Sequence, residues 1–221
     1  MVLDYTFQWR VVFRHWPELL QAGLLTLEIT VLSIVMGLAI GLVLAVCRNA
    51  ENPLARAVAV CWVSLARNTP ALLQIYVAYF GLGAFGLHLS PYASVLGAIT
   101  FNNAGYLTEI LRGGMAAVNP TQQGAALGLG MNRFQMYVHV IFPQVLRAVF
   151  LPILNQVVWA MLGTSLGMII GLQELTGMTT FLQSQTFRPF EFYFAAAVMY
   201  LAVAQIALLC GRLAALKLFR G

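Results

Sequence analysis

The sequence predicts an all-α integral membrane protein whose chain crosses the bilayer five times. Of its 221 residues, 61% are hydrophobic and 9% are charged, whereas soluble domains carry about 25% charged residues. So few charges could not cover the surface of a soluble fold of this length. The basic residues flank long apolar runs, which is typical of membrane topology. We therefore expect contacts with membrane lipid and none with nucleic acid.

Residues 1–18 predict an amphipathic segment that lies in the membrane interface before the first span. Trp9, Phe13, Trp16 and Leu20 recur at helical spacing, with charged residues between them. The remainder, residues 19–221, is expected to form one transmembrane domain. Five of its apolar runs can each cross a hydrocarbon core that needs about 20 residues. The expected spans are 19–47, 54–82, 92–111, 144–167 and 190–213.

The distribution of arginine and lysine predicts the orientation of the chain. One side of the membrane would hold eight of these residues, namely Arg48, Arg56, Arg112, Arg133, Arg147, Arg212, Lys217 and Arg220. The other side would hold three, namely Arg10, Arg14 and Arg188. The positive-inside rule then places the N-terminus outside and the C-terminus in the cytoplasm. The long segment between spans three and four is cytoplasmic in this orientation.

That cytoplasmic segment, about residues 119–143, contains a cluster of small residues. Asn119 and Pro120 are suited to cap and begin a helix, and alanine, leucine and glycine follow as far as Asn132. The helix either connects two spans only, or lets the surface of another protein approach closely. Because the chain has no nucleotide-binding motif, its energy would come from a gradient or from a partner.

The same segment resembles the coupling motif E-A-A-x3-G-x9-I-x-L-P of permease subunits in ABC importers. The corresponding residues are Gly124-Ala125-Ala126, Gly130 and Val140-Ile141-Phe142-Pro143, so the spacing agrees and glycine replaces the glutamate. Four further stretches are similar to the polar-amino-acid branch of that family, and the resemblance covers nearly the whole chain. They are residues 24–42, 65–83, 105–114 and 155–176.

The resemblance implies a type I ABC importer permease in the bacterial inner membrane. Its partners would be two cytoplasmic ATP-binding subunits, which hold ATP and Mg, and a periplasmic solute-binding protein that delivers an amino acid. The chain itself would bind no cofactor or metal and catalyse no reaction. A cleft of the ATPase would receive the residues of the motif and their neighbours, namely Gln123, Gly124, Ala125, Ala126, Gly130, Arg133 and Phe134.

The glycine at position 124 also bears on the permease dimer. The glutamate of the motif would bond to basic groups of the ATPase, and Gly124 cannot do so. A homodimer would lose this contact twice, whereas a heterodimer would lose it once. We therefore expect a second, related permease as the dimer partner.

Six polar residues within the spans are candidates for the substrate pathway, namely Arg67, Thr69, Asn102, Asn103, Thr164 and Ser165. Arg67 either contacts the substrate carboxylate or stabilises backbone that is broken at Thr69-Pro70. The asparagines, Thr164 and Ser165 either line the pathway or form hydrogen bonds between helices. The resemblance favours a role in lining the pathway for Thr164 and Ser165.

Two glutamates and three cysteines within or beside the spans are also informative. Glu109 and Arg112 are spaced for a local pair on one helix face. Glu28 predicts a buried contact at a helix interface in preference to a proton relay. Because spans three to five have no carboxylate deeper than Glu109, we expect acidic or neutral polar substrates over basic ones. Cys47, Cys61 and Cys210 are interpreted as small buried apolar residues.

Alternative functions belong to other classes. Residues 163–167 fit the G-x-S-x-G pattern of serine hydrolases, but the three histidines, His15, His88 and His139, all precede Ser165. An intramembrane serine hydrolase is therefore disfavoured. A gradient-driven secondary carrier usually needs more spans with inverted repeats. A purely structural membrane subunit is the remaining alternative.

Overall fold

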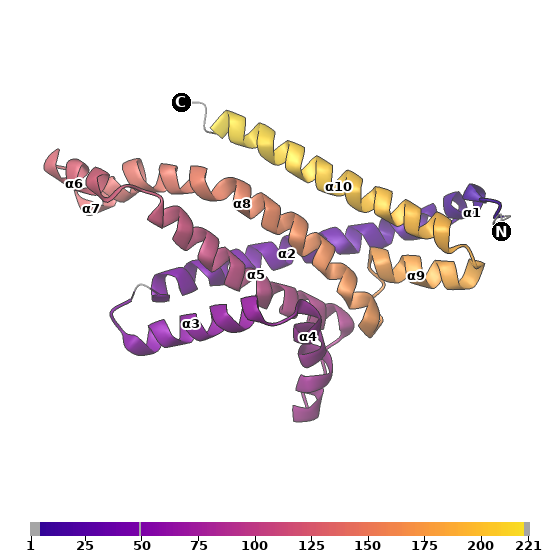
Figure 1. Ribbon diagram of the computed structural model, residues 1–221. Coiled ribbons are helices and arrows are strands. Elements are labelled where there is room, and N and C mark those ends of the chain that lie inside the picture. Colours follow the sequence, from indigo (N-terminus) through magenta and orange to yellow (C-terminus); the bar gives the residue numbers. More distant parts are fainter. Residues whose placement is uncertain (1–4, 49, 219–221) are drawn as a thin grey trace. The chain divides into compact units, whose positions relative to one another are not determined.

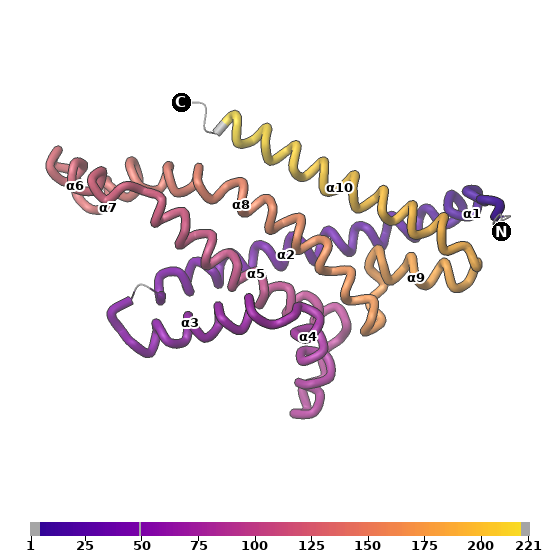
Figure 2. Tube along the Cα trace, in the orientation of Figure 1, coloured from indigo at the N-terminus to yellow at the C-terminus, as the bar shows by residue number. Residues whose placement is uncertain are grey.

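The computed structural model describes residues 5–48 and 50–218, and all regular elements within them are helical (Figure 1; the chain trace is drawn in Figure 2). The α-helices are α1 (Trp9–Arg14), α2 (Trp16–Arg48), α3 (Pro53–Asn68), α4 (Ala71–Tyr76), α5 (Pro91–Ala116), α6 (Pro120–Gly128), α7 (Arg133–Met136), α8 (Phe142–Gly163), α9 (Leu175–Thr186) and α10 (Pro189–Leu218). Shorter π and 3-10 segments are η1 (Val77–Gly81), η2 (Leu82–Phe85), η3 (Tyr137–Ile141) and η4 (Thr164–Ile170). Arg220, which was counted in the predicted orientation, lies outside the described residues.

Three described stretches are long and apolar enough to cross a membrane, namely Trp16–Arg48, Arg133–Ile170 and Pro189–Lys217. They correspond to the predicted spans one, four and five. Ala71–Phe85 is a shorter apolar helical stretch, and α5, at 26 residues, coincides with predicted span three. A count of five spans therefore remains a prediction.

The predicted break in span two is confirmed. α3 begins with Pro53 after Asn52, whose side chain accepts hydrogen bonds from the backbone N–H groups of Leu54 and Ala55. It ends at Asn68, and Thr69 is extended, with φ −118° and ψ 144°. The ring of Pro70 disfavours helical backbone at the preceding residue, so a continuous helix through this point is excluded.

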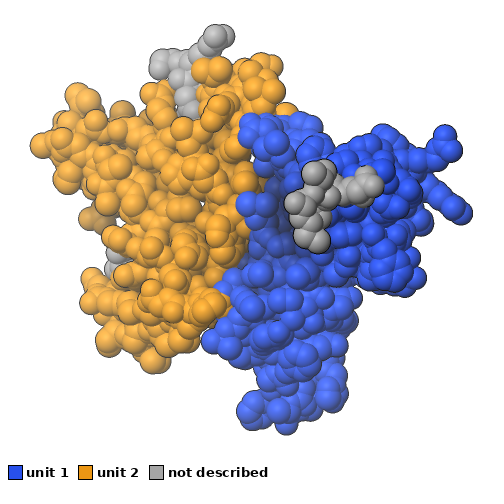
Figure 3. All heavy atoms as spheres, turned by 45° about the vertical axis from the view of Figure 1, so that its right-hand side comes forward, with its two compact units in different colours: residues 1–33, 71–99, 160–206 blue, residues 34–70, 100–159, 207–221 orange. Residues whose placement is uncertain are grey.

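The chain divides into two units, which Figure 3 shows in different colours. Unit 1 contains residues up to 33, 71–99 and 160–206, and unit 2 contains 34–70, 100–159 and 207 onward. The core of unit 1 is a buried apolar cluster drawn from α1, α2, α9 and α10, made of Val12, Leu19, Leu175, Leu182, Phe192, Ala195 and Ala196. The sequence did not predict α9, and it placed the boundary between the N-terminal segment and the first span at residue 18, whereas α1 ends at Arg14 and α2 begins at Trp16.

Helices of unit 2 approach closely at small residues of α5. A Cβ atom on Gly105 would lie 2.5 Å from the Cβ of Ala66 in α3, and one on Gly114 would lie 2.2 Å from Cγ1 of Val149 in α8. Small residues at such contacts are how helices pack in membranes, where van der Waals contact replaces the hydrophobic effect.

The interpretation of all three cysteines as buried is wrong, because Cys61 and Cys210 are exposed and Cys47 is half-buried.

Candidate functional site

Glu109 of α5 is the centre of a charged cluster in unit 2. Its side chain is 16% exposed and forms the predicted pair with Arg112, whose Nε and Nη2 donate to Oε2 at 3.1 and 2.8 Å. Arg48, at the end of α2, also donates to Glu109. Three guanidinium groups, those of Arg48, Arg67 and Arg112, lie within ion-pair distance of this one carboxylate, so the four side chains carry a net charge of +2.

Arg67 is held at the edge of this cluster. Its Nη1 lies 3.8 Å from Oε2 of Glu109, and its guanidinium stands 5.3 Å from the ring centroid of Tyr106. The Tyr106 ring is in turn 5.9 Å from that of Trp159 in α8. With 42% of the side chain exposed, the guanidinium keeps donors available to a ligand. These contacts of Arg67 go to Glu109 and Tyr106, not to the backbone at Thr69-Pro70, so both predicted roles of Arg67 stay predictions.

The two predicted asparagines form hydrogen bonds between helices of unit 2. Nδ2 of Asn102 donates to the carbonyl of Ala66, the residue before Arg67, at 2.9 Å. Nε2 of Gln156 in α8 donates to Oδ1 of Asn103 at 2.9 Å. All three amide side chains are buried. Interhelical bonding is thus confirmed for both asparagines, and Asn102 is brought beside the helix that carries Arg67.

The three predicted hydroxyl residues all donate to backbone carbonyls three or four residues earlier in the chain. In unit 2, the hydroxyl of Thr69 donates to the carbonyl of Leu65 at 2.7 Å. Thr69 is the C-cap residue of α3. Thr164 and Ser165 belong to unit 1, where they donate to Met161 at 2.8 Å and to Leu162 at 2.6 Å. A hydrogen bond from a serine hydroxyl to a preceding backbone carbonyl, such as that of Ser165, is common in helices. An activated nucleophilic serine would instead need a positioned base.

The predicted coupling segment folds as two short helices in unit 2. The side chain of Asn119 accepts from the N–H of Thr121 at 3.0 Å and Pro120 begins α6, as predicted. Asn132 and Gln135 form a reciprocal capping box at the start of α7. Gly130 lies between the helices with φ +83°, a left-handed conformation that glycine adopts without strain. The glycine of the motif is therefore required by the turn itself.

Most of the predicted ATPase-contacting residues are exposed. Gly124, Ala125, Gly130 and Arg133 are exposed, Phe134 is 76% exposed, and Gln123 is half-buried. Ala126, in contrast, is buried in the core of the chain itself and is not available to a partner. The exposed apolar residues of this segment form what we call the coupling surface, made of Leu127, Leu129, Phe134, Tyr137, Val138 and Phe142. A surface of this kind marks a contact with protein or lipid.

The sequence analysis missed a polar network around Glu174 in unit 1. This residue is fully buried and caps the N-terminus of α9, with Oε1 accepting from the N–H of Gly177 at 2.8 Å. Oε2 accepts from the hydroxyls of Tyr200 at 2.8 Å and Thr26 at 3.3 Å. Burial raises the pKa of the Glu174 carboxyl. The glutamate three residues before Gly177 was the available signal for a helix cap.

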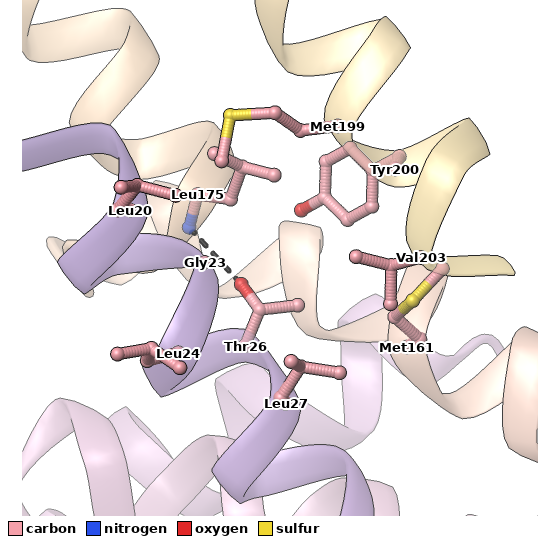
Figure 4. A pocket seen from close by; sticks show the side chains of 10 residues that line it. All are labelled: Leu20, Gly23, Leu24, Thr26, Leu27, Met161, Leu175, Met199, Tyr200 and Val203. Atoms are coloured by element: carbon pink, nitrogen blue, oxygen red, sulfur yellow. Dashed lines mark hydrogen bonds between the residues drawn. The ribbon is translucent and has the colours of Figure 1, made fainter. Parts of the chain in front are cut away.

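An apolar pocket of about 220 Å³ lies beside this network (Figure 4). Figure 4 shows Thr26 on its wall, accepting a hydrogen bond from the N–H of Leu175 at 3.1 Å. The other lining residues are Leu20, Gly23, Leu24, Leu27, Met161, Met199, Tyr200 and Val203. A charged or zwitterionic ligand would find few polar partners here, so this pocket does not fit an amino acid.

Glu28 of α2 differs from its prediction. It is exposed rather than buried, although the hydroxyl of Tyr92 in α5 does donate to its Oε1 at 2.7 Å. Its carboxylate faces a cleft of about 480 Å³ in unit 1 whose other polar lining residues are Gln21 and Gln173.

Comparison with known proteins finds the same class over most of the chain. Residues 37–217 match the family described as binding-protein-dependent transport system inner membrane component. The glutamine transport system permease protein GlnP of Escherichia coli (strain K12) is 32% identical over 202 residues, which cover 90% of this chain and 92% of that protein. The octopine transport system permease protein OccM of Rhizobium meliloti is 35% identical over 217 residues, which cover 94% of this chain and 86% of that protein.

Solved structures show the same fold. A chain from the crystal structure of an amino acid ABC transporter with histidines aligns with a TM-score of 0.90 at 27% identity, covering 96% of this chain and 100% of that chain. The inward-facing MetNI methionine ABC transporter aligns with a TM-score of 0.73 at 15% identity over 91% of this chain and 96% of that chain, a likeness of fold alone. The resemblance to ABC permease subunits is thereby confirmed. The chain belongs to the family of inner membrane components of binding-protein-dependent transport systems, the membrane-embedded permeases of ABC transporters.

Proposed function

We propose that this chain is the permease subunit of an ATP-driven importer that moves polar amino acids across the bacterial inner membrane. The coupling segment carries the proposal. Gly130, the glycine of the motif, has the left-handed backbone that its turn requires. Apolar side chains of the segment are exposed, among them Leu129 with 81% exposure. The relatives described above are glutamine and octopine permeases, which supports an amino acid or a derivative as cargo.

The proposed topology has five spans, with the N-terminus outside and the C-terminus in the cytoplasm. Two ATP-binding subunits would then engage the coupling surface in the cytoplasm, where they hold ATP and Mg, and a periplasmic solute-binding protein would deliver the substrate. Reporter fusions test this orientation. A fusion after Gly221 should report a cytoplasmic end and one near His88 an external loop, and a cytoplasmic signal at His88 would contradict five spans.

The proposed substrate pathway contains Arg67, Thr69, Asn102, Asn103, Thr164 and Ser165. The buried amides and Thr164 would shape its walls, since their recorded bonds lie within the protein. Arg67 would supply the positive charge for the substrate carboxylate. Glu109 is already paired with arginines and offers no counter-charge to a cationic side chain. Acidic or neutral polar amino acids are therefore the proposed substrates.

Uptake into liposomes tests the function and the substrate class together. The complex would be reconstituted with its ATPase and binding protein and supplied with L-glutamine, L-glutamate, L-arginine or L-lysine. ATP-dependent uptake of the first two is expected, and Arg67→Gln should raise their apparent KM. A preference for arginine or lysine would refute the substrate class. Uptake that follows an ion gradient without ATP would favour a secondary carrier.

The turn in the coupling segment yields a sharper prediction. Gly130→Ala is expected to lower transport per ATP hydrolysed severalfold, because an L-residue in left-handed backbone costs about 1–2 kcal/mol and the turn would relax away from it. Gly128→Ala is the matched control. It is the last residue of α6, and an added Cβ would meet nothing within 4 Å. Equal coupling in the two variants would show that the turn does not transmit force.

The glycine at position 124 tests the proposed heterodimer. It is exposed, and a Cβ there would meet nothing within 4 Å, so a glutamate fits without strain. Gly124→Glu should make ATPase subunits resist dissociation by salt, through charge-assisted hydrogen bonds worth about 1.5–3 kcal/mol. Gly128→Glu adds the same charge one helical turn away and should not. Mass spectrometry of the native complex should find one copy of this chain and one related permease; two copies would refute the heterodimer.

A further inference from the structure

The open cleft in unit 1 is lined by none of the pathway residues proposed above. Its polar lining consists of Gln21 and Glu28 from α2 and Gln173 from the segment before α9, and all three are exposed. Ala22, Leu24, Leu25 and Met178 complete its walls. The volume, about 480 Å³, is within the range of small-molecule sites and far larger than a single ion needs.

Glu28 is the one charged residue between Leu19 and Cys47, in a helix that is long and apolar enough to span a membrane. A carboxylate on such a helix is costly unless it faces a water-filled cavity or a positive partner. The contact recorded for Glu28 is the neutral hydroxyl of Tyr92, and no ion pair of the described residues includes it. Its exposed carboxylate, which faces the open cleft, therefore has room for a positive group from outside this chain.

The other polar groups of the cleft favour a ligand that both donates and accepts hydrogen bonds. Gln21 and Glu28 are seven residues apart in α2, which places them on one helix face two turns from each other. A side-chain amide donates and accepts, whereas an ionised carboxylate only accepts. One hydroxyl on Oε1 leaves the carboxylate with capacity for N–H donors. Together the three side chains suit a small zwitterion whose ammonium group pairs with the carboxylate.

We propose that this cleft is a further binding site for the transported amino acid, in addition to the pathway that includes Arg67, with Glu28 as the counter-ion of the α-ammonium group and Tyr92 as the residue that positions the carboxylate of Glu28. This assignment rests on the proposed function as an amino-acid importer. It is independent of the side chain of the substrate, because every α-amino acid carries the ammonium group. Glu28 would then serve for affinity, while other residues select among amino acids.

The test uses the whole reconstituted complex with L-glutamine as the probe, and L-glutamate as a second one. Glu28→Gln should raise the apparent KM by about tenfold or more, the factor expected for a lost charge-assisted hydrogen bond. Glu51→Gln is the matched control, an exposed carboxylate in the α2–α3 connection. The desamino analogue of glutamine, which lacks the α-ammonium group, should inhibit wild-type transport only weakly. The difference in affinity between glutamine and this analogue should be smaller in Glu28→Gln than in the wild type.

Two further variants keep the test decisive if Glu28→Gln does not assemble. Tyr92→Phe and Gln173→Ala leave the carboxylate in place, and each should raise the KM by a smaller factor. Unchanged KM values or undiminished discrimination would overturn the assignment. So would loss of a co-purifying second permease at unchanged KM, which would make the cleft a subunit interface. ATP-dependent uptake by the wild type is measured first. Its absence would contradict the proposed importer function, whereas the variants test only the assignment of the cleft.

Discussion

Replacing Glu174 by alanine is expected to lower the free energy of unfolding by about 3 kcal/mol. The substitution removes the cap of α9, so the N–H of Gly177 loses its acceptor, and the hydroxyls of Thr26 and Tyr200 each lose one of two acceptors. A lost cap costs about 1 kcal/mol and each orphaned donor about 1–3 kcal/mol before relaxation. Thermal unfolding of the detergent-solubilised complex would measure the loss.

Tyr200→Phe is the control for this network, because it removes one donor and leaves the cap intact. It should cost about 1 kcal/mol. If Glu174→Ala were no more destabilising than Tyr200→Phe, the carboxylate would not hold the network together.

The same carboxyl predicts a dependence of stability on pH. Burial raises its pKa in the folded chain, so the folded state holds the proton more tightly than the unfolded state does. The resulting stabilisation is complete below the unfolded value, about 4.3, and is lost as pH rises through the folded value. Glu174→Gln does not titrate, so its stability should fall less than that of the wild type over this range. Parallel pH profiles would contradict the assignment.

Replacing Glu109 by alanine is expected to cost about 2–3 kcal/mol. Arg48, Arg67 and Arg112 would lose their shared carboxylate and face one another as like charges. The 16% exposure of Glu109 allows some screening by solvent, which keeps the expected loss below that of a fully buried pair. Thermal unfolding of the solubilised complex is again the measurement.

Glu51→Ala is the matched control for Glu109, because Glu51 is exposed and forms none of the ion pairs of the described chain. Its effect should stay within about 0.5 kcal/mol. Adding Arg112→Ala to Glu109→Ala should restore part of the stability by reducing the repulsion. A double variant less stable than Glu109→Ala would show that packing, not charge, governs this cluster.

Features that depend on adjacent residues were predictable from the sequence. Asn119 caps α6 and the ring of Pro70 ends α3 through contacts within a few residues, so their chemistry is readable along the chain. The pair of Glu109 and Arg112 follows from helical spacing in the same way. The helical membrane class followed from the composition and the long apolar runs, and the family followed from the coupling motif together with four further stretches.

The contacts between distant residues were decided by the tertiary structure alone. The hydroxyl of Thr26 reaches Glu174 across 148 positions of the sequence, and Arg48 reaches Glu109 across 61. Spacing along the chain carries no information about such pairs, because helix packing chooses which faces meet. The sequence by itself therefore determined a helical membrane permease and the segment that carries the coupling motif. Packing decided that Arg67 shares the carboxylate of Glu109, and that Glu28 faces an open cleft while Glu174 is buried.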